Sequence, residues 1–163
     1  LPQVTGEQST SDKLETSTAG THGDRLYIPQ INVDVAIVKG SNESVLDQGA
    51  WHRKPENGDP VMGGNFVLSA HRFEMGLTPQ NTRAKSPFYN IDKLNTNDEL
   101  YVDYKGERYG YKVTKKYSVK PNQTEIESSS DDAKMTLYSC TLKGAADGRD
   151  VIEASFLGKV KTT

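Results

Sequence analysis

The pattern of short apolar runs constrains the fold of this 163-residue chain more than any other feature. Several runs alternate apolar and polar side chains with a period of two, and segments rich in Gly, Pro, Asn and Asp separate them. Such runs predict strands, here at residues 26–28, 33–38, 66–70, 99–104, 108–117, 135–140 and 151–159. About seven or eight strands with little helix are typical of an all-β domain, either a closed barrel or a sandwich.

The helical signals are few and short. Asn42 is a suitable N-cap for a helical turn over residues 42–47, which Gly49 would end. Ser86 and Pro87 predict the N-cap and first position of a second helix over residues 87–94. The Gly- and Pro-rich residues 53–64, residues 74–85 and the polar connection 121–134 are predicted to be loops. We therefore expect one or two short helices beside the strands.

Composition divides the chain into a tail and one domain. Residues 1–24 are rich in Ser, Thr, Gly, Glu and Gln and cannot bury enough apolar surface to order themselves, so they are predicted to be a flexible tail before a domain at 25–163. The net charge of −2 provides no strong field for nucleic acid. No apolar run approaches the roughly 20 residues that span a bilayer. Membrane attachment would therefore need a segment outside this sequence.

Three chemically active side chains lie at the ends of predicted strands. Cys140 is the only cysteine, which excludes a disulfide within the chain, and it ends the strand at 135–140. His71 follows the strand at 66–70, and Arg149 precedes the strand at 151–159. A thiolate nucleophile, an imidazole acid or base and a guanidinium that stabilises an oxyanion together suffice for acyl transfer. We therefore expect no metal and no cofactor.

Each of these residues also has a simpler interpretation. A single cysteine is commonly a small buried hydrophobic residue, and Arg149 is able to pair with a neighbouring Asp at the surface. Of the other histidines, His22 lies in the predicted tail, and His52 fits either a surface residue or a group at the rim of a substrate site. The placement of a thiol, an imidazole and a guanidinium at three strand ends favours the catalytic interpretation.

An ordered set of segments resembles the sortase family of cysteine transpeptidases. Residues 136–140, T-L-Y-S-C, resemble the family signature T-L-x-T-C, with Ser139 in place of threonine. Arg149 resembles the arginine that opens the next strand in that family, and residues 70–72, A-H-R, resemble the end of its A-G-H-R segment. The matching segments follow the family order over residues 25–159. The resemblance implies a closed eight-stranded sortase-type barrel.

The resemblance also implies roles for individual residues. Cys140 would attack the threonine carbonyl of an LPXTG-like sorting signal, His71 would move the proton of the leaving and incoming amines, and Arg149 would stabilise the oxyanion. Four residues would line the substrate groove: Ser69, Ala70, Tyr138 and Ser139. The expected partners are sorting-signal peptides and an amine acceptor, either a cell-wall precursor or a pilin lysine, and not nucleic acid. The expected location is the extracellular face of the membrane in a Gram-positive type of envelope.

Other interpretations stay open at this point. A different cell-wall cysteine transpeptidase is disfavoured because an L,D-transpeptidase has glycine directly before its cysteine, and a papain-like peptidase is disfavoured because its cysteine precedes its histidine. A catalytically silent β-barrel that binds a cell-surface partner is the alternative from another class. The sortase subclass, the preferred signal and the acceptor are not determined by the sequence.

Two further motifs suggest a metal ligand set and a substrate sequence. Four acidic residues lie in the connection before residue 135: Glu125, Glu127, Asp131 and Asp132. Carboxylates of this kind bind calcium in other proteins, but the favoured interpretation is a solvated acidic loop. Residues 1–6, L-P-Q-V-T-G, resemble a sorting signal with one extra residue between proline and threonine. We interpret them as tail sequence.

Overall fold

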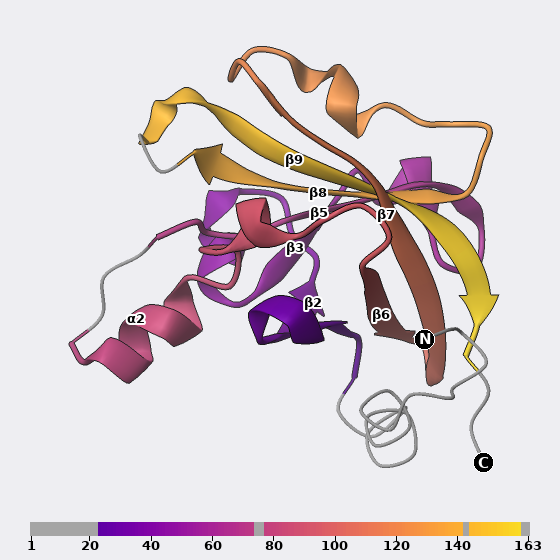
Figure 1. Ribbon diagram of the computed structural model, residues 1–163, viewed down its shortest axis with the longest axis horizontal. Coiled ribbons are helices and arrows are strands. Elements are labelled where there is room, and N and C mark those ends of the chain that lie inside the picture. Colours follow the sequence, from indigo (N-terminus) through magenta and orange to yellow (C-terminus); the bar gives the residue numbers. More distant parts are fainter. Residues whose placement is uncertain (1–22, 74–76, 142–143, 161–163) are drawn as a thin grey trace.

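Nine strands form one continuous sheet in the computed structural model, which describes residues 23–73, 77–141 and 144–160 (Figure 1). The sheet order is β3-β2-β1-β6-β7-β9-β8-β5-β4. The strands are β1 (Arg25–Ile28), β2 (Val33–Val38), β3 (Ala50–Arg53), β4 (Gly58–Asp59), β5 (Gly63–Ser69), β6 (Glu99–Tyr104), β7 (Glu107–Val119), β8 (Lys134–Thr141) and β9 (Gly144–Lys159). The predicted tail lies almost entirely outside the described residues.

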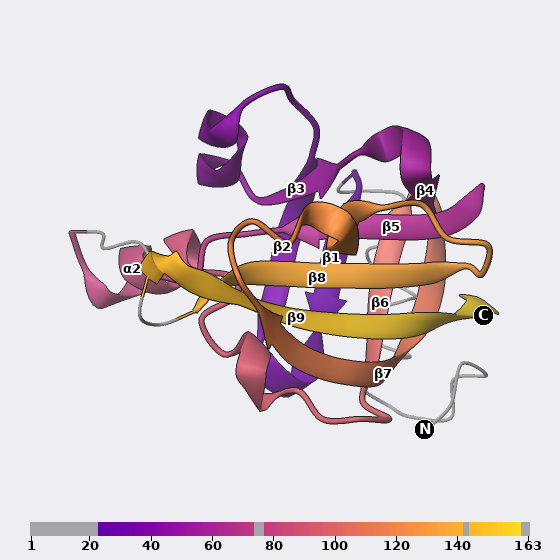
Figure 2. The same ribbon diagram turned by 90° about the horizontal axis from the view of Figure 1, so that it is seen from above.

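The sheet closes on itself because β3 also pairs with β5. This pairing joins the two ends of an eight-stranded ring, and the two-residue β4 is attached to β5 outside it. The closed eight-stranded barrel predicted from the resemblance is therefore confirmed. Strand β5 runs parallel to β8, and β8 runs antiparallel to β9. Figure 2 shows these three strands side by side.

The helices differ in part from the prediction. The turn predicted at residues 42–47 is confirmed as a 3-10 helix, Glu43–Asp47, in which the Asn42 side chain accepts a hydrogen bond from the Ser44 N–H. The other 3-10 helices of the described chain are Pro29–Ile31, Pro55–Asn57, Ile91–Lys93 and Thr124–Glu127. One α-helix, α2, spans Pro79–Lys85.

The predictions for residues 74–85 and 87–94 are wrong. The sequence contains two hydroxyl–proline start signals, and the α-helix follows the first of them. The Thr78 hydroxyl accepts a hydrogen bond from the Asn81 N–H at 3.1 Å, whereas Ser86 caps the C-terminal end of α2. Only Ile91–Lys93 is helical within the predicted second helix. Strand β4 lies within the loop predicted at residues 53–64, because Gly58 and Asp59 pair with Gly64 and Gly63.

The period-two pattern separates the two faces of β5 and β8. Phe66, Leu68, Met135 and Leu137 are fully buried in the barrel core. Their neighbours in sequence face outward. Val67 is also fully buried although it does not belong to the core cluster. Residues 120–133 explain this, because they run along the outer face of β5 and β8 (Figures 1 and 2).

A buried ion pair lies beside the turn between β6 and β7. Asp103 and Arg108 are each 1% exposed, and the Arg108 Nη2 donates to Asp103 Oδ2 at 2.7 Å. The Tyr27 hydroxyl donates to the same carboxylate at 3.3 Å, and the guanidinium lies 4.6 Å from the centre of the Tyr27 ring. Both charges are thus removed from water and depend on each other.

We expect Asp103→Ala to lower the free energy of unfolding by about 3–5 kcal/mol, because it leaves a buried guanidinium without its carboxylate. The double variant Asp103→Leu/Arg108→Met, which removes both charges, should lose less. Urea denaturation measures both values. Equal losses in the single and double variants would contradict this account of the pair.

Candidate active site

The register of three neighbouring strands brings the predicted thiol, imidazole and guanidinium to one end of the barrel. The last pair of the parallel β5–β8 ladder is Ser69 with Tyr138. His71 and Cys140 each lie two residues beyond that pair, so they follow the two parallel strands at the same level. Across the antiparallel ladder, Cys140 pairs directly with Arg149. These side chains therefore share the outward face of adjacent strands.

All three residues line one cavity of about 800 Å³. Its floor is formed by the outward residues of β3, β5 and β8, among them Trp51, Arg53 and Ser69. The 3-10 helix Glu43–Asp47 and residues 121–127 provide its walls. Such a groove is long enough to hold an extended peptide of a few residues beside the thiol, since each residue adds about 3.3 Å.

Within the described chain, the Cys140 thiol and the His71 imidazole are not hydrogen-bonded to each other. Cys140 is half-buried. The His71 Nε2 lies 3.1 Å from Asp47 Oδ1, a carboxylate that is 71% exposed. This contact orients the imidazole ring, and an imidazole is a suitable proton donor and acceptor for acyl transfer. Asp47 was missed by the sequence analysis, which interpreted residues 42–47 only as a structural turn.

Arg149 lines the same cavity. Its Nη1 donates to the Gly148 carbonyl oxygen at 3.0 Å, and its pairing with Cys140 across the β8–β9 ladder puts the two side chains on the same face of the sheet. A guanidinium so placed is suited to a developing oxyanion, because it carries several donors in one plane.

The four residues expected to bind substrate lie on different faces. Ser69, Ala70 and Tyr138 line the cavity. Ser139 does not belong to the lining; it is 2% exposed, and its hydroxyl donates to the Cys140 carbonyl oxygen at 3.2 Å. It alternates with Tyr138 and Cys140 and therefore faces the barrel interior. Substrate contact by any of the four stays a prediction.

An ion pair that sequence analysis missed fixes the wall of the cavity. Arg53 donates through Nε and Nη2 to the two oxygens of Glu127, at 2.7 and 3.2 Å. The Tyr138 hydroxyl donates to the same carboxylate, and the Asn57 amide donates to the Glu127 carbonyl oxygen at 2.8 Å. The Arg53 guanidinium also lies 4.2 Å from the centre of the Trp51 ring. These contacts join β3, β8 and the connection between β7 and β8.

A buried asparagine holds the same connection from below. The Asn65 amide nitrogen donates to the carbonyl oxygens of Ile126 and Ser128, at 3.0 and 2.8 Å. Its oxygen accepts from the Thr136 hydroxyl at 2.7 Å. The side chain is therefore engaged at both ends. Asn65 thus helps to hold the 3-10 helix Thr124–Glu127 on the barrel.

The carboxylate of Glu127 is already occupied by its protein partners. Burial raises the pKa of Glu127, but hydrogen bonds from Arg53 and Tyr138 outweigh this effect, so the pKa lies below its usual value of 4.5. Burial raises the pKa of Tyr138, which keeps its hydroxyl a donor. Within the described residues, no group of three His, Cys, Asp or Glu side chains is placed to hold a metal ion.

His52 has a structural role. It is 1% exposed, its Nε2 donates to the Gly58 carbonyl oxygen at 2.9 Å, and its ring lies edge-on to Phe66 with 4.7 Å between centroids. Burial lowers the pKa of His52, which favours the neutral ring. The interpretation of His52 as a surface or substrate-rim residue is therefore wrong. His22 lies outside the described residues.

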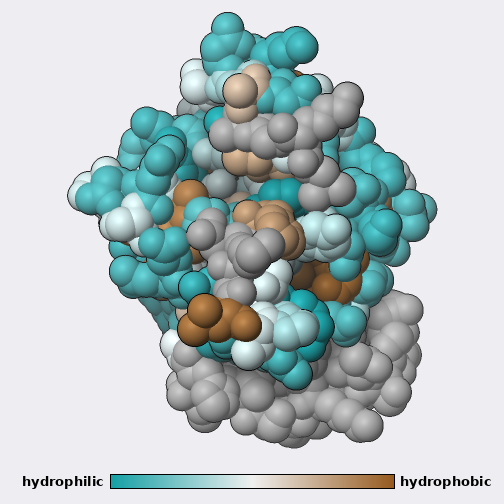
Figure 3. Space-filling model, turned by 90° about the vertical axis from the view of Figure 1, so that its left-hand side faces the viewer, coloured by the Kyte–Doolittle hydropathy of each residue, from teal (hydrophilic) through white to brown (hydrophobic). Residues whose placement is uncertain are grey.

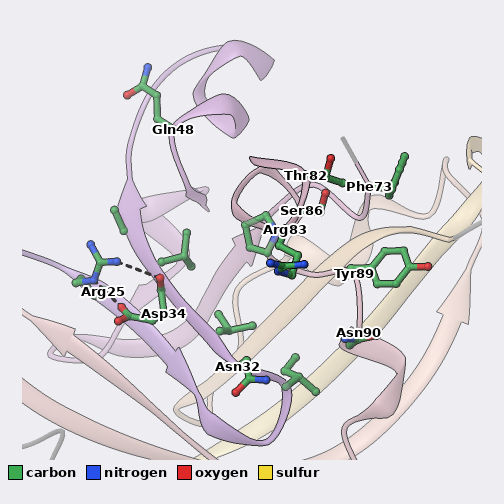
Figure 4. A pocket seen from close by; sticks show the side chains of 15 residues that line it. Arg25, Asn32, Asp34, Gln48, Phe73, Thr82, Arg83, Ser86, Tyr89 and Asn90 are labelled. Atoms are coloured by element: carbon green, nitrogen blue, oxygen red, sulfur yellow. Dashed lines mark hydrogen bonds and ion pairs between the residues drawn. The ribbon is translucent and has the colours of Figure 1, made fainter. Parts of the chain in front are cut away.

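A second cavity of about 860 Å³ lies between β2 and the residues around α2 (Figure 4). Arg25 and Asp34 line it and are paired with each other at 2.8 Å. Its lining contains neither a thiol nor an imidazole. The surface at this end of the molecule is largely hydrophilic, with separate hydrophobic groups (Figure 3). Of these two cavities, the one that contains Cys140 is therefore the candidate active site.

We expect Glu127→Gln to expose residues 120–133 to limited proteolysis about tenfold faster, because hydrogen bonds to a charged group stabilise by roughly 1.5–3 kcal/mol. Glu125→Gln is the matched control, since this neighbouring carboxylate is exposed in the same 3-10 helix. Equal cleavage rates in the two variants would contradict the anchoring role of Glu127.

The ion pair also predicts a pH dependence. Because the folded-state pKa of Glu127 lies below 4.5, its stabilising contribution is complete above that pH and is lost as the pH falls through the folded-state value. The fluorescence of Trp51, the only tryptophan, should change in this acid range in the wild type and not in Glu127→Gln. The same transition in both proteins would show that another group is responsible.

Comparison with known proteins identifies the family. The Sortase domain family matches residues 26–156. Sortase A of Listeria monocytogenes is 27% identical over 117 residues, which are 71% of this chain and 47% of that protein. Sortase A of Bacillus anthracis is 26% identical over 135 residues, which are 82% of this chain and 59% of that protein. The chain thus spans about half the length of these relatives.

The fold agrees with the sequence comparison. The structure of Listeria monocytogenes sortase A superposes with a TM-score of 0.72 at 22% identity, and the match covers 86% of this chain and 90% of that one. At this identity the superposition establishes the fold, while the family match over residues 26–156 establishes membership. The chain belongs to the sortase family.

Proposed function

We propose that the chain is a cysteine transpeptidase that cleaves the Thr–Gly bond of an LPXTG-like sorting signal and transfers the acyl group to an amine. The observation that carries the proposal is the register of β5, β8 and β9, which places His71, Cys140 and Arg149 in one cavity. Family membership supports the reaction class, and the groove supports an extended peptide as the first substrate.

In the first half-reaction, the Cys140 thiolate attacks the threonine carbonyl carbon and forms a tetrahedral intermediate. Arg149 stabilises the negative oxygen of that intermediate. His71, as an imidazolium oriented by Asp47, donates its proton to the glycine nitrogen. The C–N bond breaks, the new amino terminus leaves, and a thioester remains on Cys140.

In the second half-reaction, an acceptor amine attacks the thioester carbonyl. The neutral imidazole of His71 takes the proton of that amine, Arg149 again stabilises the oxyanion, and the C–S bond breaks. The products are a new amide bond and the Cys140 thiolate. The proton that His71 releases in one half-reaction is thus recovered in the other.

The peptide would lie along the outward face of β5 and β8. Tyr138 and Ser69 form the floor, and Trp51 and Ile126 provide apolar surface for the leucine and proline of the signal. The Arg53–Glu127 pair keeps this surface in place before the peptide binds. Such preorganisation lowers the entropy that binding must overcome.

The cellular setting belongs to the same proposal. The acceptor would be a cell-wall precursor or a pilin lysine, and the enzyme would work at the extracellular face of a Gram-positive type of envelope. Among residues 23–73, 77–141 and 144–160, no helix is both long and apolar enough to cross a bilayer.

We expect mixing with an LPXTG peptide to produce an adduct on Cys140 that intact-protein mass spectrometry detects and that an added amine releases as a new amide. Cys140→Ala should form no adduct and should lose peptide cleavage entirely, because the nucleophile is gone. Cys140→Ser, which keeps a weaker nucleophile, controls for the shape of the site. Unchanged cleavage by Cys140→Ala would overturn the proposal, and binding without any cleavage in the wild type would favour the silent binding module.

A further inference from the structure

Arg72, the residue after His71, is a buried charged residue at the edge of the cavity that contains Cys140. Its side chain is 3% exposed. Phe66, Leu68 and Ala70 belong to the barrel core, and Arg72 continues this inward series beyond the end of β5. A guanidinium in this position lies close to the strand ends that carry His71, Cys140 and Arg149. Its charge must be met by partners inside the protein.

Four hydrogen bonds meet that charge, and together they reach three parts of the structure. Arg72 Nη1 donates to the Cys140 carbonyl oxygen at 3.1 Å and to Asp150 Oδ2 at 2.6 Å. Its Nη2 donates to Asp92 Oδ1 at 2.9 Å, and its Nε donates to the Tyr89 carbonyl oxygen at 2.7 Å. One planar group therefore joins β8, β9 and residues 89–92.

The hydrogen bonds of Arg72 also constrain the residues that are adjacent in sequence to Arg149 and His71. Asp150 follows Arg149, and its second carboxylate oxygen accepts from the Ser118 hydroxyl on β7 at 2.6 Å. Arg72 itself follows His71, whose carbonyl oxygen accepts from the Phe88 N–H at 3.1 Å. A shift of the guanidinium would thus be transmitted to the backbones of all three functional residues.

We propose that Arg72 is a positioning residue that fixes the relative placement of Cys140, His71 and Arg149. The proposal rests on the proposed transpeptidase function. Arg72 belongs to the lining of the cavity, but its guanidinium donates to four protein acceptors, which suits it to hold the site in place rather than to react. Lysine cannot replace it fully, since an ammonium group is a point charge with three donors and lacks the planar fork that spans these four acceptors.

A purely structural role makes a different prediction. Arg108 is also a buried arginine in an ion pair, but it lies beside the β6–β7 turn, where its partner is Asp103. If Arg72 contributed only stability, Arg72→Met and Arg108→Met would affect the folded enzyme alike. If Arg72 positions the site, only Arg72→Met changes the chemical step.

The experiment compares the full chain carrying Arg72→Met, Arg72→Lys, Arg108→Met or Arg108→Lys at a temperature where circular dichroism shows each variant to be folded. We expect Arg72→Met to lower kcat for peptide cleavage on the order of 100-fold with KM changed less than about threefold, since a small misplacement of reacting groups has such an effect. Arg72→Lys should recover part of the loss. Both Arg108 variants should keep kcat within about threefold of the wild type.

Alkylation of Cys140 by iodoacetamide, followed by mass spectrometry, provides a readout that needs no sorting signal. The alkylation rate should fall several-fold in Arg72→Met and stay unchanged in Arg108→Met. If the wild type cleaves no peptide, the proposed function fails while this contrast still tests Arg72. If neither Arg72 variant folds, Asp150→Asn replaces them and should lower kcat or the alkylation rate about tenfold. Two results would overturn the proposal. One is a loss of rate that tracks the loss of stability in the same way for the Arg72 and Arg108 variants. The other is an unchanged rate in Asp150→Asn.

Discussion

The parallel pairing of β5 with β8 is the constraint on which the site depends. In parallel strands the carboxyl ends meet at one edge of the sheet, so the residues that follow them emerge side by side. Ser69 pairs with Tyr138, and this one register brings His71 level with Cys140. The antiparallel β8–β9 ladder then adds Arg149 opposite the thiol. A shift of one residue in either ladder would turn one of these side chains into the barrel.

The two faces of this strand trio have different tasks. The outer face carries the cavity and is covered by residues 120–133, which the Arg53–Glu127 pair and Asn65 hold in place. The inner face of β5 packs into the apolar core. Just beyond the end of this strand, Arg72 takes the place of an apolar residue. Hydrogen bonds on both faces of the sheet thus hold the strands and loops around the cavity. A site of this kind is preorganised, which is the condition for electrostatic stabilisation of a transition state.

Sequence reasoning found the features that local patterns encode. The apolar runs at residues 66–70 and 135–140 located the strands, and the ends of these runs located His71 and Cys140. The resemblance supplied the barrel closure, which no local pattern shows, since the β3–β5 pairing joins Trp51 to Ser69. The α-helix was misplaced because Thr78–Pro79 and Ser86–Pro87 provide the same start signal, and tertiary packing decides between them.

Contacts between residues distant in sequence could not be predicted. Arg53 and Glu127 are 74 positions apart, and nothing in either segment marks the other as its partner. The role of Asp47 could not be predicted for the same reason, because its contact with His71 forms only when the Glu43–Asp47 helix packs beside the end of β5. The burial of His52 likewise depends on the barrel, since its neighbours Trp51 and Arg53 on β3 face the cavity.

A crystal structure of the chain with a sorting-signal peptide that carries a chloromethyl ketone in place of the scissile bond would test the central claim most directly. The account predicts a covalent bond to the Cys140 sulfur, the peptide along β5 and β8, the ketone-derived oxygen within hydrogen-bond distance of Arg149, and His71 on the side of the leaving group. A peptide bound in the cavity beside α2, or an adduct oxygen directed away from Arg149, would contradict it.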